Sequence, residues 1–209
     1  MITIINYGAG NLFSVEKAFS ALGADVRVSS TAADILSADK IVLPGVGAFG
    51  DCMEQLNASG LIPAIREGVA RRIPLLGICV GLQILFEGSE ESSGVEGLGL
   101  LQGRVSRIAA PHEKIPHMGW NALNIVESHR EKGLFTGIPQ DSYVYFVHSY
   151  HALPKDRAII SSTCFYGEEI TASISAGNIM ATQFHPEKSG DIGLHIIQNF
   201  IYNGSEGSI

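Results

Sequence analysis

The stretch PLLGICVGLQ, residues 74–83, decides the fold class and offers the first candidate catalytic residue. Its first half is short and apolar, which is typical of a buried β-strand, and a helix is expected to follow directly. Cys79 lies between Gly77 and Gly81, giving the pattern G-x-C-x-G. A sharp strand-to-helix turn strains its central residue, and glycines two places away let the turn close and expose the sulfur. The stretch predicts an α/β fold with a nucleophile at a strand end.

The helix expected after Cys79 has its N-terminal end beside the sulfur. That end favours a thiolate and supplies backbone N–H groups where an oxyanion would form. Ordinary strand-to-helix packing explains the glycines and a small buried cysteine equally well, so the pattern needs support from elsewhere in the chain. Cys52 and Cys164 lack such neighbours and are expected to be small buried side chains.

The first hundred residues alternate short β-branched runs with amphipathic segments. Strands are expected at residues 2–5, 25–28, 40–43 and 74–78, and a helix at 11–22 with apolar residues at helical spacing and Gly23 as its stop. This alternation is typical of parallel βαβ units.

Beyond Gly99 the pattern changes to strands separated by turns. We expect strands at residues 103–109, 121–125, 143–147, 158–164, 171–176 and 178–184, several of them antiparallel. Gly177-Asn178 predicts a tight hairpin turn, and a last amphipathic helix from about residue 189 should cover one face of the sheet. The fold class is therefore α/β, with a central, mixed, mostly parallel sheet flanked by helices and a smaller antiparallel sheet in the C-terminal half. No linker interrupts the chain, which predicts a single domain over residues 1–209.

Composition excludes several kinds of partner. The chain has 14 basic and 21 acidic side chains and a net charge of −7, so it has no general attraction to nucleic acid or anionic lipid. Three cysteines without paired spacing argue against disulfides and a zinc ribbon. The N-terminus reads as a strand rather than a signal peptide, and no run approaches the roughly 20 apolar residues that span a bilayer. We expect a soluble, cytoplasmic protein.

A candidate base and its orienting carboxylate lie in QFHPEKS, residues 183–189. His185 follows Cys79 by 106 positions, since 185 − 79 = 106, and a parallel sheet brings distant strand ends to one edge. In an extended segment the side chains of His185 and Glu187 would point the same way, and Pro186 favours that conformation. Cysteine, histidine and glutamate form a complete set for nucleophilic catalysis. The other histidines form no such cluster, so no metal site is expected.

A second glycine loop, PGVGAFG at residues 44–50, follows the expected strand at 40–43. Its backbone can approach a substrate closely, as an acyl-transfer site requires, and it lacks the Lys-Ser/Thr of a phosphate-binding P-loop. A structural turn explains the loop equally well by itself.

Taken together, PGVG (44–47), GICVGLQ (77–83) and FHPEK (184–188) resemble the class I, or triad, glutamine amidotransferases over nearly the whole chain. The resemblance implies a flavodoxin-like fold without a cofactor, Cys79 as nucleophile, His185 as base and acid, and Glu187 as its orienter. It implies the backbone N–H groups of Val46 and Val80 as oxyanion donors. It also implies a glutamine pocket lined by Gly47, Gln83, His148, Ser149 and Tyr150.

Three further segments, YGAGN (7–11), IPHMGWN (115–121) and FVHSY (146–150), resemble the glutaminase subunit of imidazole glycerol phosphate synthase. That family implies a heterodimer with a (β/α)8-barrel cyclase, through which ammonia travels to make imidazole glycerol phosphate and an aminoimidazole carboxamide ribotide in histidine biosynthesis. Candidate residues for the docking surface or tunnel mouth are Asn11, Met118, Trp120, Tyr145 and Lys188. Core packing is the alternative role for Met118 and Trp120. The chain departs from the family pattern at Asn6, Val80 and Leu82.

Three alternatives stay open on the sequence. The same chemistry could serve another acceptor, as in the amidotransferases of pyridoxal phosphate synthase or anthranilate synthase. A related fold could carry a cysteine peptidase. A binding subunit with a decayed site is the non-enzymatic alternative.

Overall fold

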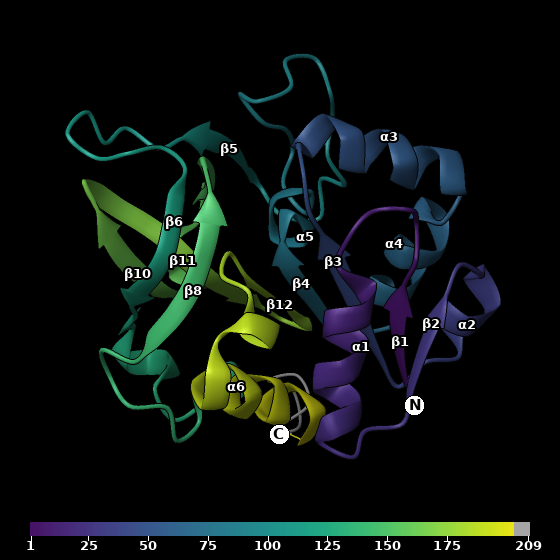
Figure 1. Cartoon of the computed structure of the whole chain (residues 1–209). Helices are drawn as coiled ribbons and strands as arrows, with labels where there is room; N and C mark the ends of the chain where they lie inside the picture. Colours follow the sequence, from purple (N-terminus) through teal and green to yellow (C-terminus); the bar gives the residue numbers. More distant parts are fainter. Residues whose placement is uncertain (203–209) are drawn as a thin grey trace.

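An eight-stranded sheet forms the centre of the computed structural model, which describes residues 1–202 (Figure 1). In spatial order its strands are β2 (Val26–Ser29), β1 (Ile2–Ile5), β3 (Lys40–Gly45), β4 (Leu75–Cys79), β12 (Ile179–Thr182), β11 (Glu168–Ala176), β10 (Ile160–Tyr166) and β7 (Asn124–Ile125). The neighbours from β2 to β12 are parallel, and those from β12 to β7 are antiparallel. The predicted mixed sheet is confirmed.

Helices cover both faces of the parallel part of the sheet. They are α1 (Leu12–Ala21), α2 (Ala32–Leu36), α3 (Phe49–Ser59), α4 (Ile62–Ala70), α5 (Val80–Gln83) and α6 (Gly190–Tyr202). Helices α1 and α6 contact each other on one face, whereas α2 and α3 both contact α4 (Figure 1). The predicted helix at 11–22 is confirmed as α1, with Asn11 as its N-cap. Within residues 1–202, no helix is long and apolar enough to cross a membrane.

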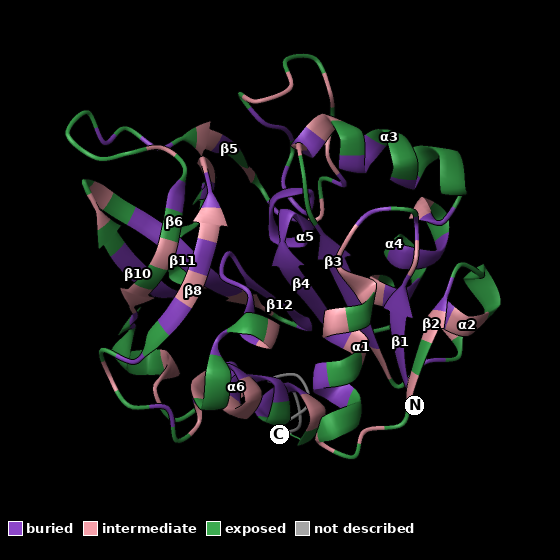
Figure 2. Cartoon of the chain, viewed as in Figure 1, coloured by how far each residue is buried: buried purple, intermediate pink, exposed green. Residues whose placement is uncertain are grey.

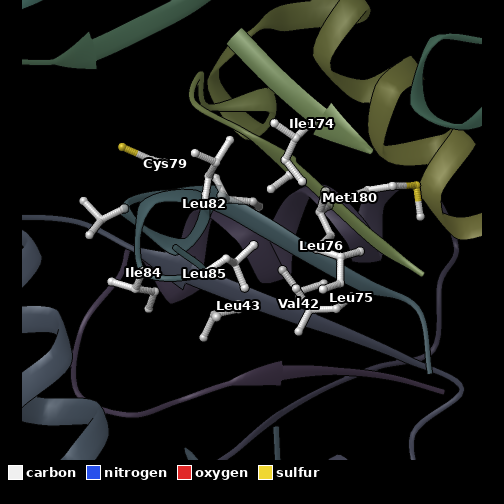
Figure 3. Packing of buried hydrophobic residues seen from close by; sticks show 14 of the residues in the cluster. Val42, Leu43, Leu75, Leu76, Cys79, Leu82, Ile84, Leu85, Ile174 and Met180 are labelled. Atoms are coloured by element: carbon white, nitrogen blue, oxygen red, sulfur yellow. The ribbon is translucent and has the colours of Figure 1, made fainter. Parts of the chain in front are cut away.

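The core lies between these helices and the sheet, whose central strands are buried along their length (Figure 2). Every residue of β4 and β12 is buried, as parallel strands covered on both faces require. In Figure 3, Leu76, Met180 and Ile174 pack beside one another, and the sulfur of Cys79 points away from this apolar cluster. Each fully buried aliphatic side chain of this kind contributes about 1.5–3 kcal/mol.

Two small antiparallel sheets, rather than the single one predicted, stand beside the C-terminal half of the central sheet. One pairs β5 (Gly103–Arg107) with β9 (Tyr150–Pro154), and the other pairs β6 (His117–Ala122) with β8 (Tyr143–His148). The sequence did not predict β9. The predicted continuous strand at 121–125 is wrong, because the chain leaves β6 at Leu123 and then pairs with β10 as β7.

Turns and short helices complete the chain. The predicted hairpin is confirmed, since Ala176 pairs with Ile179 across Gly177-Asn178, and Gly177 has φ 60°. The 3₁₀ helices are η1 (Glu127–His129), η2 (Gly133–Phe135), η3 (Arg157–Ile159) and η4 (Pro186–Lys188). Because β1, β3, β4 and β12 are parallel, the loops that follow them meet at one edge of the sheet, where such folds bind ligands.

Candidate active site

Cys79 is the last residue of β4 and has φ 55°, a left-handed conformation that is rare for a residue with a side chain. The glycines around it are required by close packing. A Cβ on Gly81 would lie 1.9 Å from the carbonyl oxygen of Leu43, and one on Gly77 would lie 2.9 Å from that of Gly81. Helix α5 is a single turn, shorter than the sequence suggested, so its dipole is small, but its first N–H groups still lie beside the sulfur.

His185 follows β12, and its ring is held by Glu187. The two atoms His185 Nδ1 and Glu187 Oε1 are 2.8 Å apart, and the side chains are 3% and 1% exposed. His185 is extended as predicted, but Glu187 lies in the 3₁₀ helix η4 rather than in an extended segment. The two side chains therefore meet through a tight turn at Pro186, which corrects the predicted geometry.

The charge state of His185 depends on its two neighbours. Burial alone would lower the pKa of its imidazole, but hydrogen bonds to Cys79 and Glu187 and the negative charges of both groups raise that pKa to about 9. Because Nδ1 faces Glu187, Nε2 is the nitrogen available to Cys79. The structure thus brings the three predicted catalytic residues together. The second carboxylate oxygen of Glu187, Oε2, is buried without a hydrogen-bond partner.

A pocket of about 380 Å³ opens over Cys79. Cys79, His185 and Lys188 line this pocket. So does every residue predicted for the oxyanion site and the glutamine pocket, namely Val46, Gly47, Val80, Gln83, His148, Ser149 and Tyr150. Sequence reasoning missed three further lining residues, Glu91, Pro116 and Val147. Pro116 and Val147 lay inside quoted motifs, whereas nothing marked Glu91, whose Oε2 accepts a 2.8 Å hydrogen bond from the N–H of Phe49.

Two buried glutamines connect the pocket wall to the sulfur. Gln83 Nε2 donates to the carbonyl oxygen of Tyr150 and to Gln183 Oε1, both at 3.0 Å. Gln183 Nε2 in turn approaches Cys79 Sγ at 3.8 Å. Both amide hydrogens of Gln83 are used, so its own Oε1 is left to accept from a substrate. Gln183 was quoted in the sequence motif but was not predicted as a site residue.

A second chain of hydrogen bonds runs from β6 to the same wall. Burial lowers the pKa of His117 to about 4 and that of His148 to about 3, so both rings are neutral at pH 7. His148 Nδ1 donates to Tyr150 O at 2.8 Å, so its Nε2 must accept from His117 Nδ1 at 2.9 Å. Asn121 Nδ2 then donates to His117 Nε2 at 3.2 Å. His148 therefore lines the pocket as an uncharged side chain whose two ring nitrogens are both hydrogen-bonded.

The residues predicted for docking lie on several elements, and Lys188 is the one among them that lines the pocket. Met118 and Trp120 are 61% and 55% exposed, so core packing is wrong for both. Trp120 is opposite Tyr145 across β6 and β8, with ring centroids 6.2 Å apart. Lys188 lines the pocket, and Asn11 caps α1. Within residues 1–202, no group of three or more side chains is arranged to hold a metal ion.

Comparison with known proteins identifies the family. Residues 3–203 match the family described as glutamine amidotransferase class-I. The chain therefore belongs to the class I glutamine amidotransferases. Solved structures share the fold: a glutamine amidotransferase has TM-score 0.73 at 16% identity, covering 95% of this chain and 98% of its own. PurLQS from Thermotoga maritima has TM-score 0.75 at 19% identity, covering 95% of each chain.

Closer relatives narrow the family. Imidazole glycerol phosphate synthase subunit HisH of Methanocaldococcus jannaschii is 50% identical, covering 96% of this chain and 98% of its own. The subunit of the same name from Moorella thermoacetica is 49% identical, covering 95% of this chain and 93% of its own. Among class I amidotransferases the chain thus groups with the HisH subunits. The Arabidopsis thaliana chloroplastic synthase hisHF is 44% identical over 97% of this chain, which matches 34% of that longer protein.

Proposed function

We propose that the protein is the glutaminase subunit of imidazole glycerol phosphate synthase in the cytoplasm, and that it releases ammonia from L-glutamine. The observation that carries the proposal is that Cys79 and His185 line one pocket with Val46 and Gly47, while Glu187 holds the His185 ring from behind. Nucleophile, base and orienting carboxylate are then within reach of a backbone that can stabilise an oxyanion.

The pocket offers hydrogen-bond acceptors for the N–H groups of glutamine. Glu91 supplies a carboxylate for the α-ammonium group, and its position is fixed by the N–H of Phe49. Gln83 Oε1 supplies a second acceptor in a fixed orientation. The side-chain amide of the substrate is then directed toward Cys79. Glu91→Gln should raise KM for glutamine about tenfold and change kcat little, because it removes ground-state binding.

The first half of the reaction forms a thioester. Because the pKa of His185 is about 9, its Nε2 already holds the proton of the Cys79 thiol at pH 7, and the sulfur attacks the carbon of the substrate's side-chain amide. The oxyanion that develops faces the N–H groups of Val46 and Val80. When the tetrahedral intermediate collapses, the C–N bond breaks, and His185 gives its proton to the leaving nitrogen, which departs as ammonia. Glu187 stabilises the imidazolium between these transfers.

The second half consumes water. His185 takes a proton from a water molecule, whose oxygen attacks the thioester carbon, and the C–S bond then breaks. The sulfur leaves as a thiolate, the proton stays on His185, and glutamate departs, which restores the starting pair of thiolate and imidazolium. The net reaction is glutamine plus water giving glutamate plus ammonia.

We further propose that a (β/α)8-barrel cyclase subunit receives the ammonia and uses it to form imidazole glycerol phosphate and an aminoimidazole carboxamide ribotide. The exposed side chains of Met118, which is opposite the pocket-lining Val147, and of Trp120 on the same strand support a partner at this face. The Arabidopsis relative also supports it, since a homologous region occupies about a third of a longer chain that is named a synthase.

The test is glutamine turnover by the full chain, alone and with a cyclase subunit, followed as glutamate and ammonia released. Cys79→Ala should lose glutaminase activity by at least about a thousandfold. Cys164→Ala is the control, because that thiol is buried in β10 away from the pocket. Full turnover by Cys79→Ala would exclude the mechanism. Recovery of a different synthase with the chain from its native host would exclude the acceptor and leave the glutaminase chemistry in place.

A further inference from the structure

Two buried side chains outside the proposed catalytic set hold the loop that faces Cys79. Tyr7, in the loop after β1, is 5% exposed, and its hydroxyl donates a 2.8 Å hydrogen bond to the carbonyl oxygen of Pro44. Cys52, in the first turns of α3, is fully buried, and its Sγ donates to the carbonyl oxygen of Val46 at 3.3 Å. Two carbonyl groups of one glycine loop are thus held from the interior side.

The loop has little else in its own sequence to fix it. Gly45 pairs with Cys79 at the end of β3, where a Cβ would lie 2.6 Å from the N–H nitrogen of Gly81, so the start of the loop rests against the nucleophile turn. Gly47 has φ 92°, a conformation that glycine adopts freely, and its surroundings are open. The peptide between Val46 and Gly47 therefore needs an external anchor to keep one orientation.

The hydrogen bond from the Cys52 thiol sets the orientation of the peptide group between Val46 and Gly47. In a trans peptide the carbonyl group and the following N–H group point in opposite directions. Because the Val46 carbonyl points to the buried Cys52, the Gly47 N–H points away from Cys52, and Gly47 itself lines the pocket. The orientation keeps a carbonyl oxygen, which would repel an oxyanion, out of the site.

The Tyr7 hydroxyl and the Cys52 thiol have one hydrogen each to donate to the loop. Burial raises the pKa of both the Tyr7 hydroxyl and the Cys52 thiol, so each stays protonated and has one hydrogen to donate. Tyr7 uses its hydrogen on Pro44 O and Cys52 uses its hydrogen on Val46 O, and the two groups lie close enough to influence each other's pKa. The two side chains form one unit.

We infer that Tyr7 and Cys52 are positioning residues for the glutaminase reaction, which keep the carbonyl groups of Pro44 and Val46 turned away from the oxyanion that the Val46 N–H receives. The inference rests on the proposed function. It assigns no contact between either residue and the substrate, so their loss should lower kcat and leave KM nearly unchanged.

The experiment measures kcat and KM for glutamine with the full chain bound to a cyclase subunit. Tyr7→Phe removes one donor at nearly constant volume, and Cys52→Ala removes the other donor together with its sulfur atom. Each should lower kcat about tenfold with KM within about twofold. Cys52→Ser restores a donor and should recover most of the activity. The double variant should lose less than the product of the two single losses, because the groups act as one unit. Cys164→Ala, which also removes a buried thiol, should behave as wild type.

Each alternative result has a distinct meaning. A kcat within about twofold of wild type for both Tyr7→Phe and Cys52→Ala would overturn the inference and leave the glutaminase assignment intact. An increase in kcat would also overturn it, since the bond would then hold the loop away from the productive orientation. If Cys52→Ala fails to fold, Tyr7→Phe and Cys52→Ser decide the question. A wild-type chain that does not hydrolyse glutamine would overturn both the inference and the proposed function.

Discussion

At the scale of single residues, the pH response of the site is governed by His185. Its pKa of about 9 exceeds the ordinary value of 6.5, because contacts with Cys79 and Glu187 outweigh the effect of burial. The protonated ring must donate to the leaving nitrogen, so kcat should fall as pH rises through about 9. Glu187→Gln removes one neighbouring charge and should move this alkaline limb to lower pH.

Glu187→Gln should also lower kcat at least about tenfold, since the orienting group no longer stabilises an imidazolium. The measurement is the pH profile of kcat for glutamine hydrolysis from pH 6 to 10. Glu67→Gln is a suitable control, because Glu67 is an exposed carboxylate paired only with Arg71. An alkaline limb at the same pH in wild type and Glu187→Gln would contradict the assignment of that limb to His185.

Gln183 is the second residue-scale case. Gln183→Met keeps the volume but removes the donor that approaches Cys79 and the acceptor for one amide hydrogen of Gln83. The buried amide of Gln83 would then lack a partner and lose its fixed orientation. We expect kcat to fall about tenfold and KM to rise, measured as glutamate release. Gln140→Met, which disrupts a glutamine bonded to Asn124 elsewhere, should change neither constant, and equal effects in both variants would refute a specific role.

At the scale of elements, the turn between β4 and α5 depends on Gly81. The missing Cβ allows the turn to touch the carbonyl oxygen of Leu43 on β3, and a backbone atom there cannot move aside as a side chain could. Gly81→Ala should therefore destabilise the protein by roughly 3 kcal/mol or more, measured by urea unfolding. Gly68→Ala is the matched control in α4, because its Cβ would meet only side-chain atoms, the nearest being the end of the Ile41 side chain at 2.9 Å. Similar midpoints for both variants would show that this contact is not limiting.

Elements with a local signal could be predicted from the sequence. The apolar runs predicted the parallel strands. Gly23 marked the end of α1, and Gly177-Asn178 marked the turn of the β11–β12 hairpin. The break at Leu123 could not be predicted in this way, because the N–H of Leu123 bonds to Ser142 O, 19 positions away by 142 − 123 = 19. Strand pairings of this kind depend on which distant segments fold together.

Some residues of the candidate site could be predicted from a local sequence signal, and others could not. Cys79 and His185 each follow a predicted strand, so the rule that parallel strand ends meet placed them in one pocket, although their roles stay predictions until they are tested. Glu91 and Gln183 carried no comparable signal. Each acquires its place through a folded neighbour, Phe49 for the first and Gln83 for the second.

At the scale of the whole molecule, the pocket is one part of a larger face. The chain of hydrogen bonds from Asn121 through His117 and His148 to Tyr150 joins β6, where the exposed Trp120 lies, to the pocket wall. A partner seated on Trp120 would therefore rest on the strand that supports the glutamine site. The same strand, β6, would then carry the docking surface and support the pocket. We expect this connection to link ammonia release to the presence of the partner.

Trp120→Ala provides the test at this scale. The side chain is 55% exposed and its only ring contact in residues 1–202 is with Tyr145, so its loss should leave the thermal midpoint within about 2 °C of wild type. A tryptophan at the centre of an interface commonly contributes about 2 kcal/mol or more, so the Kd for a cyclase subunit should rise at least about tenfold, measured by calorimetry. Tyr202→Ala is the control, because this aromatic residue is 65% exposed and belongs to α6 rather than to β6 or β8. Equal affinities for Trp120→Ala and wild type would move the docking surface away from β6 and β8.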